Sequence, residues 1–163
     1  MYDTPLTIEQ LLNRLAAAPA RLASLTEGLS TAQLLAPPEP GEWSERDVLA
    51  HLRSCADMWG RAIAVILSQD HPTFKAVNPT TWIKQTNYLE LEFQPSLVAF
   101  TAQRAALLET LRPLAPEDWA RAATVTGAGK PLDRSVYTYA QWLANHERSH
   151  YRQLDNIARA VAA

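Results

Sequence analysis

Two histidines near the end of this 163-residue chain, His146 and His150, have the spacing of a metal site. Side chains four residues apart lie on the same face of a helix, so both imidazoles can bind one ion. Both fall on a predicted apolar stripe, where leucine would be ordinary. His51 lies at the edge of another such stripe, between Val48 and Cys55. Because burying imidazoles without partners costs free energy, the three histidines predict a metal site, with hydrogen-bonded core histidines as the alternative.

The segment from His146 to His150 also matches the H-E-x-x-H pattern of zinc proteases. That class takes a third ligand from further along the chain, but only thirteen residues follow His150. The extended pattern H-E-x-x-H-x-x-G-x-x-H also fails, because Gln153 stands at its glycine and Asn156 at its third histidine. His51, upstream, therefore fits better as the third ligand. Glu147 is interpreted as a general base or as a solvated helix residue. Three neutral histidines leave a coordination position open, which is typical of catalytic sites.

For several other side chains the sequence allows two interpretations, one as part of the site and one as a structural residue. Cys55 follows His51 by one helical turn and either approaches the metal or is a small buried hydrophobe. Arg104 binds a substrate anion or forms a structural ion pair. His71 precedes a proline in a loop and is predicted at the surface. Four aromatic side chains line a pocket or simply belong to the core: Trp43, Trp59, Tyr88 and Trp142.

Apolar residues recur every three or four positions in four long segments, which predicts helices over about 7–27, 44–68, 89–111 and from 138 almost to the end. These helices predict one all-α domain spanning residues 1–163, an up-down four-helix bundle. In an up-down-up-down order, the second and fourth helices run parallel. His51 and His146 lie at similar depths in them, so the three histidines are expected at one level of the bundle.

Local signals mark several boundaries. Pro19 is expected to kink or split the first helix. Ser44 with Asp47 predicts a capping box for the second helix, and Thr138 with Gln141 predicts one for the fourth. The polar segment 69–87 is long for a connection and is expected to cover a site or cross the bundle. Residues 124–133 are expected to form a loop or a small hairpin.

Composition limits the classes of protein. Hydrophobic residues make up 47% and charged residues 20%, and the net charge is -2, so nucleic acid is not an expected partner. No apolar run approaches the length of a membrane span, and no secretory signal is visible, so no membrane partner is expected. The single cysteine cannot form an internal disulfide, which fits a reducing compartment. We expect a soluble, cytoplasmic protein.

The chain resembles the DinB/YfiT-like superfamily over about residues 11–157. The resemblance is carried by five segments, each weak alone but specific together: Gly41–Ser44, Val48–Leu52, Phe100–Leu111, Pro116–Trp119 and His146-x-x-x-His150-x-x-Gln153.

This resemblance implies a four-helix bundle that binds one divalent metal ion, zinc or nickel, through His51, His146 and His150. Members of the family can also have a carboxylate among the metal ligands, and in this chain the corresponding candidate is His51. The resemblance further implies a small-molecule substrate. Characterised relatives include transferases and isomerases that use a low-molecular-weight thiol, and many members form a homodimer.

Four functions follow as hypotheses. The first is a metal-dependent S-transferase that uses a low-molecular-weight thiol, because an open metal site can lower the pKa of a bound thiol. The second is a metal-dependent hydrolase, which would act without thiol and use a base such as Glu147. The third is a non-enzymatic metal-binding stress or scaffold protein. The fourth is a helical interaction module that binds no metal.

Overall fold

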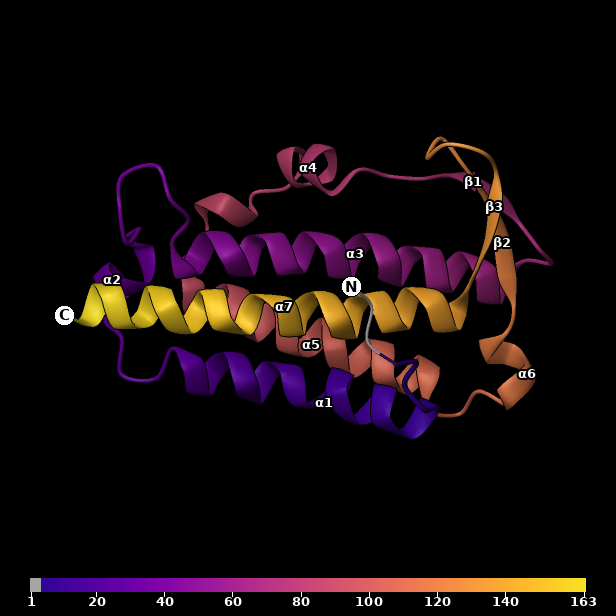
Figure 1. Ribbon diagram of the computed structural model, residues 1–163, viewed down its shortest axis with the longest axis horizontal. Coiled ribbons are helices and arrows are strands. Elements are labelled where there is room, and N and C mark those ends of the chain that lie inside the picture. The colour runs from indigo at the N-terminus through magenta and orange to yellow at the C-terminus, as the bar shows by residue number, and fades with distance from the viewer. Residues whose placement is uncertain (1–3) are drawn as a thin grey trace.

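Four long helices pack side by side along the length of the molecule (Figure 1). The computed structural model describes residues 4–163. The long helices are α1 (Ile8–Leu25), α3 (Glu45–Ser68), α5 (Phe93–Leu111) and α7 (Val136–Ala162). Short helices lie between them: α2 (Thr31–Leu35), α4 (Pro79–Trp82), α6 (Pro116–Trp119) and the single turns η1 (Ile83–Gln85) and η2 (Tyr88–Glu90). The predicted four-helix bundle is confirmed.

The helix starts follow from local hydrogen bonds. Ser44 Oγ accepts from the backbone N–H of Asp47 at 3.2 Å, and Asp47 Oδ2 accepts from the backbone N–H of Ser44 at 3.0 Å, so the predicted capping box is confirmed. The start predicted for α7 is wrong. Ser135 caps this helix instead, with its Oγ accepting from the backbone N–H of Thr138 at 3.1 Å. Helix α1 continues as one element through Pro19.

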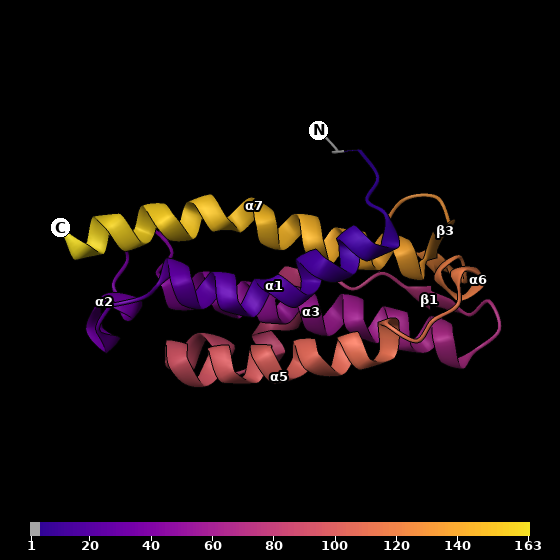
Figure 2. The same cartoon turned by 90° about the horizontal axis from the view of Figure 1, so that it is seen from below.

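The directions of the helices differ from the expectation. Helices α3 and α5 run one way, and α1 and α7 run the other way (Figures 1 and 2). Thus Trp59, late in α3, contacts Trp142, early in α7, whereas His51, early in α3, contacts His150, further along α7. The expected parallel pair is therefore antiparallel, because the connection after α3 returns along the bundle before α5 begins. The histidines still meet, since His146 and His150 lie near the middle of the long helix α7.

That returning connection is fastened to α3 by side chains. Asp57 Oδ2 accepts hydrogen bonds from Trp82 Nε1 at 3.3 Å and from the Tyr88 hydroxyl. The guanidinium of Arg53 lies 3.8 Å from the centre of the Tyr88 ring. These contacts hold the segment along α3, so it runs back along the length of the bundle.

A small sheet covers the end of the bundle where α3 ends and α7 begins (Figure 1). Its strands are β1 (Thr73–Lys75), β2 (Ala122–Thr126) and β3 (Leu132–Ser135), in the order β1-β2-β3. β1 pairs parallel with β2, and β2 pairs antiparallel with β3. The hairpin expected within 124–133 is thus confirmed. Strand β1 is not predicted from sequence, because three residues are too short to show a period.

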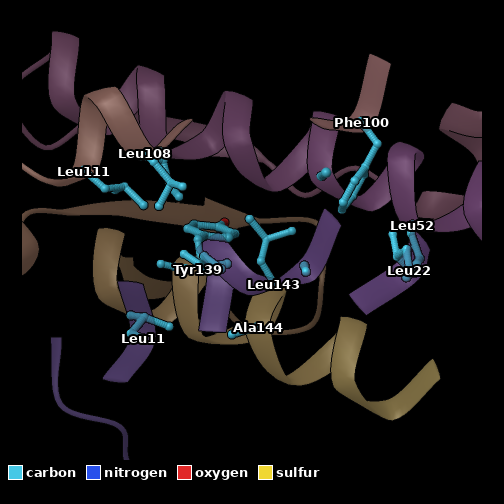
Figure 3. Packing of buried hydrophobic residues seen from close by; sticks show 14 of the residues in the cluster. Leu11, Leu22, Leu52, Phe100, Leu108, Leu111, Tyr139, Leu143 and Ala144 are labelled. Carbon is cyan, nitrogen blue, oxygen red and sulfur yellow. The ribbon is translucent and has the colours of Figure 1, made fainter. Parts of the chain in front are cut away.

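Side chains from all four long helices form the core (Figure 3). Leu11 and Leu22 come from α1, and Leu52 comes from α3. The residues labelled from the other two helices are Phe100, Leu108, Leu111, Tyr139, Leu143 and Ala144. The apolar faces of the four helices pack against one another and exclude water without disulfides or other cross-links, as expected for a chain of this length. Among residues 4–163, no helix is both long and apolar enough to cross a membrane.

Glu45, in the first turn of α3, is fully buried, and this burial raises the pKa of its carboxyl to about 8. That value includes two smaller effects: the backbone of Ala158 lowers the pKa, and the nearby Asp155 charge raises it. Between pH 4.5 and about 8 the folded protein therefore holds a proton that the unfolded chain releases, so stability falls as pH rises through this window.

We expect Glu45→Gln to weaken this pH dependence, because the amide cannot ionise. Between about pH 5 and about pH 8, the free energy of unfolding should fall by roughly 2–3 kcal/mol less in Glu45→Gln than in the wild type. Urea denaturation at the two pH values measures it. Exposed Glu27→Gln is the control and should leave the pH dependence unchanged. Equal pH dependence in wild type and Glu45→Gln would contradict the prediction.

Candidate metal centre

Three histidines meet where α3 and α7 pack together. His51 comes from the second turn of α3, and His146 and His150 come from successive turns of α7. The Nε2 atoms of His51 and His146 are 2.9 Å apart, and those of His146 and His150 are 3.2 Å apart. The structure thus brings together all three histidines that the sequence analysis singled out.

Hydrogen bonding alone satisfies this cluster poorly. His146 Nε2 has either one hydrogen or one lone pair to offer, yet two other ring nitrogens lie within 3.2 Å of it. In a tetrahedral zinc site, zinc–nitrogen bonds of about 2.0–2.1 Å place the ligand nitrogens about 3.3 Å apart. The spacing here is close to that value, so the donor set fits a divalent transition metal.

The protonation of the histidines also suits a metal. Burial, with smaller contributions from the neighbouring His150 and His51, lowers the pKa of His146 to about 3. Burial likewise lowers the pKa of His51. Both rings are therefore neutral at physiological pH, which is the form that binds metals.

Cys55 lies beside the histidines as a fourth donor. Its Sγ is 3.9 Å from His51 Nε2 and 4.0 Å from His146 Nε2, and the ligand atoms of these three residues all lie within 4.8 Å of one another. Burial, with a smaller contribution from the Glu147 charge, raises the pKa of the Cys55 thiol to about 12. The interpretation that Cys55 approaches the site is thus the one that the geometry supports.

Aromatic rings surround the cluster. The Trp43 ring centre is 5.3 Å from that of His51, and the Trp59 ring centre is 5.3 Å from that of His146. Trp142 packs on Trp59 at 5.8 Å. Three of the four aromatic candidates therefore lie in or next to the site. Tyr88 does not, because it is held on the returning connection by Asp57.

A cavity of about 750 Å³ opens on the His150 side of the cluster. Trp43 and His150 line it together with Gln153 and Arg152. A molecule of substrate size can therefore approach the histidines from this side.

Glu147 and Arg104 form a buried ion pair rather than part of the site. Each is 2% exposed, and Arg104 Nη1 donates to Glu147 Oε1 at 2.9 Å. The same nitrogen donates to the backbone carbonyl of Leu15 at 2.9 Å. The interpretation of Glu147 as a solvated residue is wrong. Its carboxylate is paired with Arg104 and is therefore not a free base. For Arg104, the structural ion pair is confirmed.

His71 lies apart from the cluster, on the small sheet. Its Nε2 is 3.1 Å from Thr124 Oγ1 and 3.2 Å from Asp133 Oδ1, and its side chain is half exposed. The predicted surface position is confirmed.

Gln153 is a positioning residue that the spacing arguments did not identify. Its Oε1 is 2.7 Å from His150 Nδ1 and, as a carbonyl oxygen, accepts the hydrogen on that nitrogen. This bond leaves the lone pair on Nε2, the atom that faces His146. The i, i+3 spacing on one helix face was the available signal.

We expect Gln153→Ala to weaken zinc binding about 10–100-fold, because His150 then loses the bond that fixes its tautomer. Competition with a fluorescent zinc chelator measures the affinity. Gln141→Ala, a substitution elsewhere on α7, is the control and should leave the affinity unchanged. Zinc affinity equal to that of the wild type in Gln153→Ala would contradict the role assigned to this residue.

Comparison with known proteins agrees with this architecture. Residues 14–154 match the model of the DinB superfamily. Among solved structures, the chain is similar to YfiT from Bacillus subtilis, described as a probable metal-dependent hydrolase with an unusual four-helix bundle topology. The two are 17% identical, with a TM-score of 0.79 over 98% of this chain and 91% of that one.

A second similar structure is TT2238, described as a four-helix bundle protein. It is 20% identical, with a TM-score of 0.63 over 92% of this chain and 99% of that one. No curated protein matches the chain. At these identities, the two solved structures show the fold alone.

Proposed function

This chain belongs to the DinB superfamily, and we propose that it is an enzyme that binds one divalent metal ion, zinc or nickel, through His51, His146 and His150. The observation that carries the proposal is the convergence of three imidazole nitrogens beside an open cavity. Structural zinc sites are closed by four protein ligands, whereas catalytic sites keep a position open.

The first candidate reaction is transfer of a low-molecular-weight thiol to an electrophilic small molecule. A bound divalent metal would lower the pKa of a thiol, so that it is a nucleophile at neutral pH. Thiol transfer is favoured by the position of Glu147, because this carboxylate is paired with Arg104 and does not serve as a free base for hydrolysis.

The residues of this chain supply binding and orientation. Gln153 holds the His150 ring with its Nε2 toward the cluster. The Trp43 and Trp59 rings pack on His51 and His146 and keep water from their outer faces. The cavity at His150 admits the small-molecule substrate.

Hydrolysis is the second candidate, favoured by the similarity to YfiT, itself described as a probable metal-dependent hydrolase. It shares the same ligands but uses water in place of thiol. The two candidates are therefore separated by whether turnover needs a thiol.

The first test is the metal content of protein purified without a histidine tag or chelators, measured by elemental mass spectrometry. We expect about one equivalent of zinc or nickel, lost in His150→Ala. His71→Ala is the matched control, because His71 lies outside the cluster, and it should keep the metal.

The second test is turnover of 1-chloro-2,4-dinitrobenzene with glutathione, bacillithiol or mycothiol, beside hydrolysis of p-nitrophenyl acetate without thiol. Thiol-dependent turnover lost in His150→Ala supports the transferase. Thiol-independent hydrolysis lost in the same variant supports the hydrolase. A protein that is free of metal and takes up neither zinc nor nickel contradicts both and leaves a helical interaction module.

A further inference from the structure

A second, smaller cavity lies where β1 and the segment after it cross the outer face of α3 near the start of α7 (Figure 1). Its volume is about 170 Å³. Met58 and Ala62 of α3, Phe74 of β1 and Tyr139 of α7 supply apolar surface. Met58, Ala62 and Tyr139 are buried. For comparison, an apolar cavity of about 150 Å³ binds benzene, so this cavity has room for one small ring or branched chain.

Cationic side chains join this apolar surface. Arg61, Lys75 and Arg134 line the cavity, and no acidic side chain of residues 4–163 is among its lining residues. The Nε of Arg134 is buried and has no hydrogen-bond acceptor among residues 4–163. Three cations around an apolar cavity create a positive potential that favours an anionic group.

Each of these cations has a neighbour that restricts it, although Arg61 and Lys75 are exposed. The guanidinium of Arg134 lies 4.7 Å from the Trp142 ring centre, and that of Arg61 lies 5.5 Å from the Trp82 ring centre. The stem of Lys75 lies against Gly127, where an added Cβ would come within 2.8 Å of Lys75 Cγ. Cations that are already positioned lose less freedom when they bind a ligand.

We propose that this cavity binds a small organic monocarboxylate, with its apolar body against Met58, Ala62 and Phe74 and its carboxylate on Arg134 and Lys75. The proposal stands independently of metal binding. Trp59 connects the two sites, since it lines this cavity and its ring also packs on His146. The Trp59 ring therefore separates a ligand bound here from the histidine cluster.

The experiment is isothermal titration calorimetry of the full chain with benzoate and, as its uncharged counterpart of similar shape, benzamide. We expect benzoate to bind about tenfold more tightly than benzamide, because charge-assisted hydrogen bonds are stronger than neutral ones. Lys75→Gln should reduce that preference, and Ala62→Leu should weaken both probes by filling the cavity. Arg159→Gln removes an equal charge from an exposed position on α7 and should change neither affinity.

Equal binding of benzoate and benzamide, or binding of neither, would overturn the proposal. An equal loss in Arg159→Gln and Lys75→Gln would also overturn it, since it would show attraction to net charge alone. Each titration is repeated in His150→Ala. Benzoate binding retained in that variant supports a site independent of the metal, and its loss there contradicts the proposal without bearing on the metal centre.

Discussion

Replacing Arg104 with Met is expected to lower the free energy of unfolding by about 3–5 kcal/mol, because it leaves the buried Glu147 carboxylate without its partner. Both side chains are 2% exposed, so water cannot replace the lost bonds. The substitution also removes the donor to the Leu15 carbonyl and so loosens α1 from α5 and α7. Urea denaturation monitored by circular dichroism measures the effect.

Two further variants separate this cause from loss of side-chain volume. In Arg104→Met/Glu147→Leu, no charge stays buried, and we expect most of the lost stability to return. Arg159→Met breaks the exposed pair of Arg159 with Asp155, and it should cost less than about 0.5 kcal/mol. A loss below about 1 kcal/mol in Arg104→Met would show that the buried pair is not a stabilising contact.

The largest loss of metal affinity is expected from His146→Ala, at least about 100-fold, above the 10–100-fold typical of residues that only support a ligand. His146 Nε2 lies within 3.2 Å of the ligand nitrogens of both other histidines, so its removal takes away the centre of the cluster. Competition with a fluorescent zinc chelator at neutral pH measures the affinity, and circular dichroism checks that the variant is folded.

Cys55→Ser is the informative counterpart. Its Sγ is 3.9–4.0 Å from the nearest histidine nitrogens, but burial raises the pKa of its thiol to about 12. The thiol therefore holds its proton at neutral pH, whereas the thiolate is the form that binds metals. We therefore expect Cys55→Ser to weaken zinc binding less than about tenfold, below the loss in Gln153→Ala or His146→Ala. A loss as large as that in His146→Ala would make Cys55 a fourth ligand. The centre would then be closed, and a non-enzymatic metal-binding role would replace the proposed enzyme.

The candidate site was predictable because its elements are local. His146 and His150 are four residues apart, so they lie on one face of any helix that contains both. His51 lies among periodic apolar residues, which identify the buried face of its helix. Such local patterns could not predict how close His51 and His146 lie, because these residues are 95 positions apart in the sequence. Their similar depths in two helices taken as parallel predicted that they lie at one level. The two histidines do meet, but α3 and α7 are antiparallel, so the predicted helix directions are wrong.

By itself the sequence determined the four helices, the cap at Ser44, the pair of histidines on α7 and the family, since each depends on neighbours within a few turns or on short motifs. The tertiary structure decided the helix directions, the neighbours of Cys55 and the roles of Arg104 and Glu147. Arg104 and Glu147 are 43 positions apart, and nothing local distinguishes a buried pair from two exposed charges. Their pairing depends on α5 and α7 packing together, because that contact excludes the water that would otherwise solvate each charge.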